Sequence, residues 1–485
     1  MAESVKQKAA KGVVWSTIQR FSAMGIQFVS GIVLARLLTP SDYGAIGMLL
    51  IFMLVSQTIM DSGFSAALIQ RKNPTQLDYS TVFWWEITLA VVMYLVLFGT
   101  APFIAKFYRM PILCMVLRVQ AISLILGALS SIQRTQLRKQ FRFKEICIVS
   151  VSTSLVSLGV TIVLAYKGFG VWSLVAQHVL MSFIPMVAFA FAAKWLPSFS
   201  FSKEAFKGLF SFGFFIFLTH VINEICNNIQ GLLIGRFYNA STMGYYSKAR
   251  STETLAATSI SHGLTQVTFP LYSAIQDDKV ALSDMIKKLT VTVAYLMFPM
   301  MLLLVLVAKP IFLVLYSDRW LPSVPYFQIL CLSGMAVCLQ AINLQAISAI
   351  GKSKTMFSWT VIKRCVGMTL LIGGLWLWQI QGLLVGMVCS SWFIYIVNAY
   401  LVSKHIGYKL QRQLLDLLPI FLLSVIAFVA SWTFSQIYTM DVFLSAALKT
   451  TFFLGVYLLL SYFCHLKGLS WSVEIVKKIL KKEKK

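Results

Sequence analysis

The chain has 485 residues, of which 58% are hydrophobic and 12% are charged, and its mean hydropathy is +0.78. This composition excludes an ordinary soluble globular protein and indicates a protein of the lipid bilayer. The 42 lysines and arginines outnumber the 17 acidic residues. They gather in every second connection between apolar segments, which is a pattern of membrane topology and not of nucleic-acid binding.

Apolar segments long enough to cross a membrane recur along the whole chain. A transmembrane helix needs about 20 mostly apolar residues, and we therefore expect an all-α, polytopic membrane protein with about 14 transmembrane helices. The predicted spans, in chain order, are 12–38, 41–69, 79–104, 111–136, 144–167, 170–193, 206–235, 241–272, 284–308, 323–348, 357–378, 381–404, 412–437 and 442–466.

The connections set the expected orientation. If all of these spans cross the membrane, the basic connections fall on one side, and the positive-inside rule then places both termini in the cytoplasm. The eight cysteines lie within or at the ends of apolar segments without a CxxC pair. We interpret them as packing residues and expect neither a metal nor a cofactor.

The sequence contains an internal duplication. The turn between the first two spans returns two hundred positions later with the same residue types at the same spacing. Gly31, Arg36, Ser41 and Gly44 recur as Gly231, Arg236, Ser241 and Gly244. Because the repeat holds six helices, an even number, the two copies start on the same side of the membrane and are parallel. We expect two pseudo-symmetric six-helix lobes that are related by an axis along the membrane normal.

The duplication predicts four parts of the chain. These are an N-terminal lobe at 1–200 with helices 1 to 6, a C-terminal lobe at 201–408 with helices 7 to 12, an extra hairpin at 409–468 with helices 13 and 14, and a basic, amphipathic cytoplasmic tail at 469–485. The linker at 196–208 alternates phenylalanine with lysine, which suits the cytoplasmic membrane interface.

Polar residues inside predicted spans are the best indication of function, because charge in a bilayer is costly and usually faces a wet cavity or a partner. Arg20 and Gln27 share one face of the first span. His220, Glu224 and Asn227 occupy the corresponding face of the seventh span. We expect both faces to line a central cavity. For Arg20 the alternative is that its side chain extends to the headgroups.

Further cations are candidates for substrate binding. The eighth span is polar where the matching second span is apolar, and we expect Arg250 to face a ligand, with Glu253 as its partner at i+3. Arg118 and Arg364 are weaker candidates, since each lies within two turns of a predicted helix end.

Acidic residues in the spans are candidates for ion coupling. Asp61 lies about eight residues before the cytoplasmic end of the second span, where a structural ion pair is an equal alternative. Glu86 follows two tryptophans that suit the interface, and we expect it to reach water. The full set of coupling candidates is Asp61, Glu86, His220, Glu224 and Glu253.

Catalytic motifs are absent from the sequence. It has no phosphate-binding loop for ATP, no GxSxG, no HExxH and no paired aspartate motif. We therefore expect a transporter and not an enzyme, driven by an ion gradient or by the gradient of its own solute.

Two short stretches resemble a known family. The segment from Leu34 to Gly44, LARLLTPSDYG, and the segment DSGF from Asp61 with its following ALIQ are similar to the polysaccharide-transporter family, often called Wzx-type flippases. Its wider superfamily also contains lipid II flippases and multidrug exporters. The resemblance implies twelve core helices in two lobes and a rocking, alternating-access motion.

The resemblance also implies a substrate, an undecaprenyl-diphosphate-linked oligosaccharide that is carried across the bacterial inner membrane for O-antigen, capsule or exopolysaccharide assembly. Candidate partners are membrane lipids, a polysaccharide polymerase and a chain-length regulator. Two alternatives remain. A cation-coupled multidrug exporter of the same superfamily would favour acidic cavity residues, and a polysaccharide polymerase would need a sizeable outward loop.

Overall fold

The structure is a computed structural model that describes residues 5–61, 64–71, 73–351, 353–437 and 442–471. Within these ranges all regular secondary structure is helical. The chain forms two compact units, Met1–Ser247 (unit 1) and Lys248–Lys485 (unit 2). The prediction of an all-α, polytopic membrane protein is confirmed.

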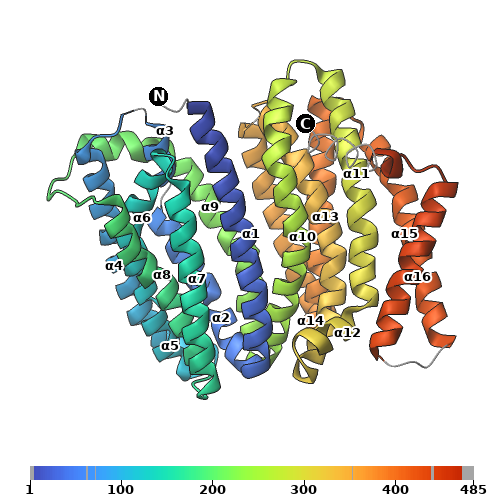
Figure 1. The fold of residues 1–485 in the computed structure, drawn as a ribbon, viewed down its shortest axis with the longest axis horizontal. Helices are drawn as coiled ribbons and strands as arrows, with labels where there is room; N and C mark the ends of the chain where they lie inside the picture. The colour runs from blue at the N-terminus through green and yellow to red at the C-terminus, as the bar shows by residue number, and fades with distance from the viewer. Residues whose placement is uncertain (1–4, 62–63, 72, 352, 438–441, 472–485) are drawn as a thin grey trace. The chain divides into compact units, whose positions relative to one another are not determined.

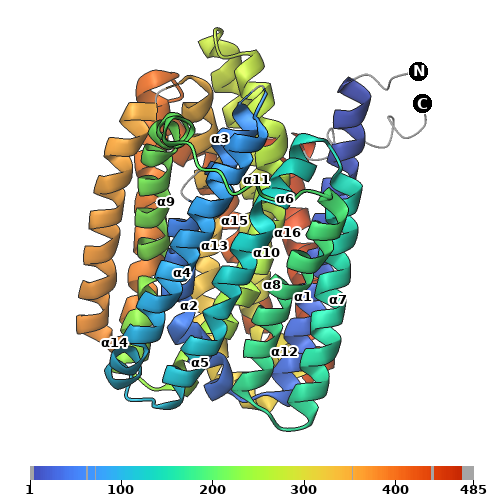
Figure 2. The same ribbon diagram turned by 90° about the vertical axis from the view of Figure 1, so that its left-hand side faces the viewer.

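Unit 1 is a bundle of long helices, shown from blue to green in Figure 1 and from its side in Figure 2. Helix α7 packs against both α1 and α8, α6 packs against α8 and α4, and α9 packs along α2. The helices are α1 (Val5–Leu37), α2 (Pro40–Asp61), α3 (Phe64–Gln70), α4 (Gln76–Phe107), α5 (Ile112–Gln120), α6 (Ile122–Lys139), α7 (Phe143–Tyr166), α8 (Val171–Ala193), α9 (Lys203–Phe237) and the first turns of α10 (Ala240–Ala274).

The duplicated turn has the same local structure in both copies. Helices α1 and α9 end at Leu37 and Phe237, and α2 and α10 begin three residues later in each case. In the first copy the Oδ2 atom of Asp42 accepts from the backbone N–H and the hydroxyl of Thr39, at 2.9 and 2.7 Å. In the second copy the Oδ1 atom of Asn239 accepts from the backbone N–H and the hydroxyl of Thr242, at 2.8 and 2.9 Å. A polar side chain thus stabilises each helix start.

Two glycines allow the two copies to touch. A Cβ atom on Gly44 would lie 1.7 Å from the carbonyl oxygen of Ala240, and one on Gly244 would lie 1.8 Å from that of Pro40. Only glycine permits so close an approach of two backbones. Each residue of one contact corresponds to a residue of the other at an offset of two hundred. The first turns of α2 and α10 therefore cross reciprocally, as expected at a pseudo-twofold axis.

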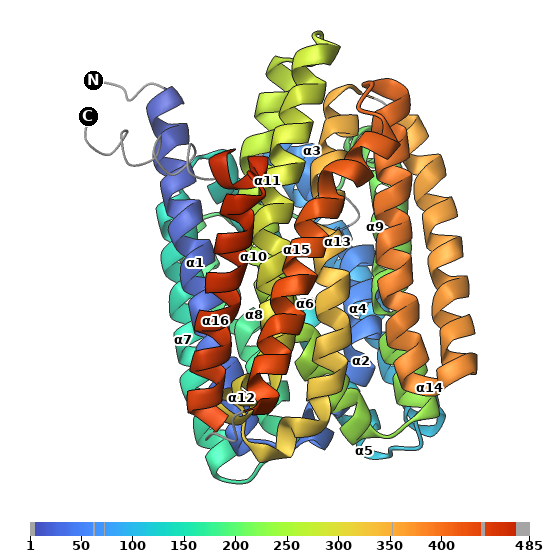
Figure 3. The ribbon, with the colours of Figure 1, turned by 90° about the vertical axis from the view of Figure 1, so that its right-hand side faces the viewer.

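Unit 2 contains the remainder of α10 and a second set of helices (Figure 3). Helix α11 packs against α13 and α15, and α15 pairs with α16. The elements are α11 (Lys279–Leu306), α12 (Ala308–Leu315), the 3₁₀ helix η1 (Asp318–Ser323), α13 (Val324–Ala349), α14 (Ser353–His405), α15 (Leu410–Ile437) and α16 (Val442–Phe463).

Helix α14 is two helices joined by a tight turn. Its backbone leaves the helical conformation at Trp378 and Gln379. Next to this turn the two halves approach through glycines, because a Cβ atom on Gly374 would lie 2.1 Å from the carbonyl oxygen of Gly382. The turn falls between the predicted spans 357–378 and 381–404, which the two halves match.

Eleven segments of the described chain are long and apolar enough to cross a membrane, and one of them, Ser358–His405, contains the turn of α14. The chain is a multi-pass membrane protein. Helices α9 and α10 are not among these segments. Helices α2 and α3 both fall within the predicted span 41–69, and residues 62 and 63 between them lie outside the described part of the chain. Helix α12 was not predicted.

The compact units divide after Ser247 because α9 packs on α2, α3 and α4, whereas the sequence division at residue 200 follows the duplication. The lobes 1–200 and 201–408 and the hairpin 409–468 stay predictions of the repeat. Most of the predicted tail, residues 472–485, lies outside the described part of the chain.

Candidate functional site

An ion pair lies on α10 in unit 2. The Nη1 atom of Arg250 is 3.2 Å from the Oε2 atom of Glu253. The side chain of Glu253 is 2% exposed, whereas that of Arg250 is 39% exposed. The predicted i+3 pair is confirmed. Its geometry leaves part of the guanidinium group available to another anion, because one guanidinium carries five N–H donors.

Lys248 is more deeply buried than Arg250 and lies against aromatic rings. Only 3% of its surface is exposed. Its Nζ atom lies 4.0 Å from the ring centre of Tyr316 and 5.6 Å from that of Trp320. Both rings belong to the segment between α12 and α13, and Trp320 is fully buried. Cation–π attraction of this kind stabilises an ammonium group where water is scarce.

Hydrogen bonding and backbone packing fix the rest of this cluster. The hydroxyls of Tyr316 and Thr252 are 3.0 Å apart, and burial raises the pKa of Tyr316. Glu253 packs on α13 at Gly334, where a Cβ atom would lie 2.8 Å from its Oε1 atom. We call Lys248, Arg250 and Glu253 the α10 cluster. Arg250 is paired with Glu253, whereas Lys248 lies about 160° around the helix from Arg250 and contacts Tyr316 and Trp320 instead.

A second pair of cations lies on the first half of α14. Lys363 is 7% exposed, and its Nζ atom donates to Oδ1 of Asn398 at 2.9 Å, which links the two halves of α14. Arg364, the predicted candidate, is half-buried and is therefore the less buried member of the pair.

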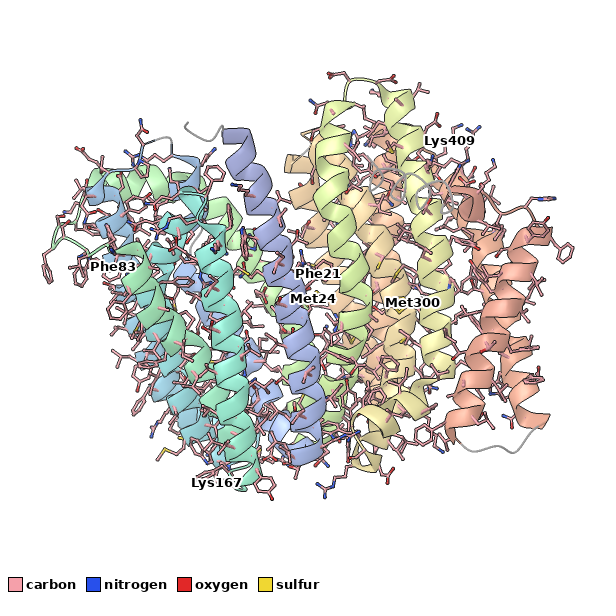
Figure 4. The ribbon with its side chains drawn as sticks, in the orientation of Figure 1. Phe21, Met24, Phe83, Lys167, Met300 and Lys409 are labelled. Atoms are coloured by element: carbon pink, nitrogen blue, oxygen red, sulfur yellow. The ribbon has the colours of Figure 1, made fainter. Side chains whose placement is uncertain are left out.

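The polar face of α1 lies beside its packed face. Gln19 donates to the hydroxyl of Ser150 on α7 at 2.9 Å. Arg20 and Gln27 lie on the next stripe, about 100° around the helix. Arg20 is half-buried and Gln27 is exposed. Met24, between them on the same stripe, is near the middle of α1 in Figure 4.

The corresponding stripe of α9 is polar and partly exposed. His220 and Asn227 are exposed, and Glu224 is half-buried. The Nδ2 atom of Asn228 donates to Oε2 of Glu224 at 3.0 Å. The structure thus places the predicted residues on accessible faces in both copies of the repeat. A shared cavity between these faces stays a prediction.

The structure corrects the expectation for Glu86. Glu86 does not reach water, since it is 2% exposed and its Oε1 atom has no hydrogen-bond partner within the described residues. The reason is packing, because α6 lies against α4. Asp61, the last described residue before position 64, is exposed.

Asp61 and Glu86 belong to α2 and α4, which pack against each other in unit 1. Arg118 lies elsewhere in that unit. Its guanidinium carbon is 4.1 Å from the ring centre of Phe98, and its Nε atom donates to the Phe98 carbonyl oxygen at 3.3 Å. These contacts give Arg118 a structural role in joining α5 to α4.

Sequence reasoning missed the aromatic surroundings of Lys248 and the partner of Lys363. The spacing of Tyr316 and Trp320, four residues apart in a connection, was a weak signal for an aromatic pair that accepts a cation. The described residues contain no group of three or more metal-ligating side chains.

Comparison with known proteins relates this chain to polysaccharide biosynthesis proteins. Residues 33–325 match the family described as polysaccharide biosynthesis protein. TuaB of Bacillus subtilis (strain 168), a teichuronic acid biosynthesis protein, is 26% identical over 358 residues, which cover 73% of this chain and 74% of TuaB. WzxC of Escherichia coli (strain K12), a lipopolysaccharide biosynthesis protein, is 23% identical over 437 residues, or 88% of each chain.

The fold is also known. A structure of the lipid II flippase MurJ in an inward closed conformation superposes with a TM-score of 0.74 at 15% sequence identity, covering 93% of this chain and 98% of that one. This likeness shows a shared fold. Because the family match extends over more than half of the sequence, the chain belongs to the polysaccharide biosynthesis protein family that the turn between its first two helices indicated.

Proposed function

We propose that this protein is a flippase that moves undecaprenyl-diphosphate-linked oligosaccharide units from the cytoplasmic to the outer leaflet of the bacterial inner membrane. The observation that carries the proposal is the ion pair of Arg250 with the buried carboxylate of Glu253, in which the Arg250 side chain is 39% exposed and its guanidinium group has further N–H donors for another anion. A diphosphate offers charge-assisted acceptors to a guanidinium group, and these hydrogen bonds are about twice as strong as neutral ones.

The comparisons support this proposal at the level of the pathway. TuaB is described as a teichuronic acid biosynthesis protein and WzxC as a lipopolysaccharide biosynthesis protein, and MurJ is described as a lipid II flippase. We propose transport by alternating access, without a chemical step on the substrate. Both termini lie in the cytoplasm, and a polymerase and a chain-length regulator act on the delivered unit.

The charges of the α10 cluster disfavour the alternative function, export of cationic drugs. An exporter of cationic drugs needs acidic groups that attract its substrate, whereas the one carboxylate of the α10 cluster is already paired with Arg250. In the proposed mechanism Arg20 and Arg250 bind the diphosphate, and Gln27 and Asn227 offer hydrogen bonds to the sugars. Asp61, Glu86, His220, Glu224 and Glu253 are the proposed coupling residues.

Variants at Arg250 test the proposal. Arg250→Ala should abolish polysaccharide export, but it also leaves Glu253 buried and unpaired, which is destabilising in itself. The double variant Arg250→Ala/Glu253→Gln removes that unpaired charge. We expect the double variant to accumulate in the membrane like the wild type and still to export no polysaccharide, whereas Arg250→Lys keeps part of the activity.

Arg20→Ala is the matching test in unit 1, because Arg20 forms no ion pair with any residue that the structure describes. Its loss should leave the protein level unchanged and reduce export. Wild-type export from both Arg20→Ala and the Arg250/Glu253 double variant would refute the role of these cations.

A further inference from the structure

The connection between α8 and α9 is a non-helical strap, residues 194–202. It lies along the start of α4. The Nε2 atom of Gln76 donates to the Leu196 carbonyl oxygen at 2.8 Å, and the Nε1 atom of Trp84 donates to the Ser198 carbonyl oxygen at 2.9 Å. The backbone N–H of Ser198 donates to the hydroxyl of Ser80 at 3.0 Å. These bonds hold the strap in one conformation.

Aromatic packing fixes the inner side of the strap. The ring of Trp195 lies 5.6 Å from that of Phe83 and 6.3 Å from that of Tyr79, centre to centre. Phe83 belongs to a buried cluster with Phe64 and Ile132. Figure 4 shows Phe83 near one end of unit 1 and Lys167 at the opposite end. The strap is therefore a fixed part of the end that carries Phe83.

The outer side of the strap is apolar and unusually exposed. Leu196 is 82% exposed, Phe199 is 95% exposed and Phe201 is 50% exposed. Two exposed lysines, Lys194 and Lys203, lie at its two ends. The first turns of α9, which follow, run across the end of unit 1 instead of along it (Figures 1 and 2).

The polar backbone and the apolar side chains of the strap restrict its position relative to the membrane. A non-helical segment cannot enter the hydrocarbon core, because its free backbone N–H and C=O groups have no water there. Three large apolar side chains are nevertheless unfavourable in water. Both conditions are met at the membrane interface, where the backbone stays hydrated among the headgroups and apolar side chains enter the acyl region.

The charges at this end of unit 1 select the kind of lipid. Arg71 and Arg142 at this end are paired with Asp78 and Glu145, whereas Lys139 donates to backbone carbonyl oxygens and the two lysines of the strap are exposed. Basic segments beside a membrane attract anionic headgroups. We propose that the strap is a binding surface for anionic phospholipid, in which Leu196, Phe199 and Phe201 insert below the headgroups and Lys194 and Lys203 contact the lipid phosphates.

Site-specific photocrosslinking tests this surface. The photoreactive amino acid p-benzoylphenylalanine replaces Phe199 in the full-length protein, which is reconstituted in vesicles of phosphatidylethanolamine and phosphatidylglycerol. Phe103, which is 74% exposed on a transmembrane helix, is the positive control, and Phe64, which is 1% exposed, is the negative control. The probe keeps an aromatic ring at an exposed position, so the fold should tolerate it.

We expect lipid adducts at Phe199 as at Phe103, enriched in phosphatidylglycerol over its share of the vesicle. The double variant Lys194→Gln/Lys203→Gln should lose this enrichment at Phe199 and leave the adducts at Phe103 unchanged. Lipid adducts at Phe103 without any at Phe199 would overturn the proposal, and so would an enrichment that survives loss of both lysines. A single protein adduct at Phe199 in native membranes would also overturn it, in favour of a protein partner.

Discussion

Replacing Gly44 by alanine should destabilise the protein through a single methyl group. The new Cβ atom would lie 1.7 Å from the carbonyl oxygen of Ala240, whereas real Cβ contacts hardly ever fall below 3.0 Å. The first turns of α2 and α10 would have to separate by at least about 1.3 Å at this point, since a backbone carbonyl cannot rotate away as a side chain does. Overpacking of this kind costs about 1–3 kcal/mol.

The melting temperature of the purified protein, followed by tryptophan fluorescence in detergent, measures this cost. A loss of about 1–3 kcal/mol corresponds to a fall of several degrees, at roughly 2–4 °C per kcal/mol for domains of about 200 residues. The matched control is Gly99→Ala on α4, where a Cβ atom meets nothing within 4 Å. Alanine in a helix is about 0.5–1 kcal/mol more favourable than glycine, so this control should melt at the same or a higher temperature.

Because Gly44 and Gly244 make equivalent contacts, a substitution at either glycine should have the same effect. Gly244→Ala should lower the melting temperature by a similar amount, because its Cβ atom would lie 1.8 Å from the Pro40 carbonyl oxygen. Both substitutions push apart the same two helix starts. The double variant should therefore lose less stability than the two single losses together. Equal melting temperatures for wild type, Gly44→Ala and Gly99→Ala would refute the close contact between the first turns of α2 and α10. If the stability loss of the double variant equalled the sum of the two single losses, the two glycines would not act on the same contact.

Three further predictions concern single side chains, each checked by the melting temperature and by the protein level in membranes. Tyr316→Ala removes the ring beneath the ammonium group of Lys248 and should cost about 0.5–2 kcal/mol, whereas Tyr316→Phe keeps the ring and should cost less. Glu86→Gln should accumulate normally because the amide matches the buried carboxyl group in shape, but Glu86→Lys should not accumulate, since it buries a charge without a partner. Tyr408 donates to Asp416 at 2.6 Å, and burial, with this carboxylate, raises its pKa. Its contribution to stability is therefore complete below about pH 10 and declines as the pH rises further, and Tyr408→Phe should remove that alkaline decline.

The sequence predicted the helices well where hydropathy alone decides them. The predicted span 144–167 is α7 at Phe143–Tyr166, and 170–193 is α8 at Val171–Ala193. The duplicated turn was also predictable, since the residues that cap α2 and α10 and the glycines that let them touch are local in sequence. Lys309 and Pro310 interrupt the apolar run where α11 ends, but the eight residues of α12 are too few for a transmembrane span, and the search for spans therefore did not predict this helix.

Burial of polar residues depended on contacts that are distant in sequence. The tryptophans before Glu86 suggested an interface position, but α6 and the strap cover this part of α4. The Arg250 and Glu253 pair was predictable because it lies within one helical turn. The rings around Lys248 come from the segment after α12, and periodicity along α10 contains no information about them.

The leaflet on which lipid-linked oligosaccharide accumulates tests the proposed function most directly. The gene is deleted in the producing cell, the lipid-linked oligosaccharides are extracted, and their accessibility on each leaflet is measured with an impermeant probe. A flippase predicts completed single units that are trapped on the cytoplasmic leaflet and released when the gene is restored. Single units that accumulate on the outer leaflet would contradict flipping and indicate a polymerase, and unchanged glycolipids with altered drug sensitivity would indicate an exporter.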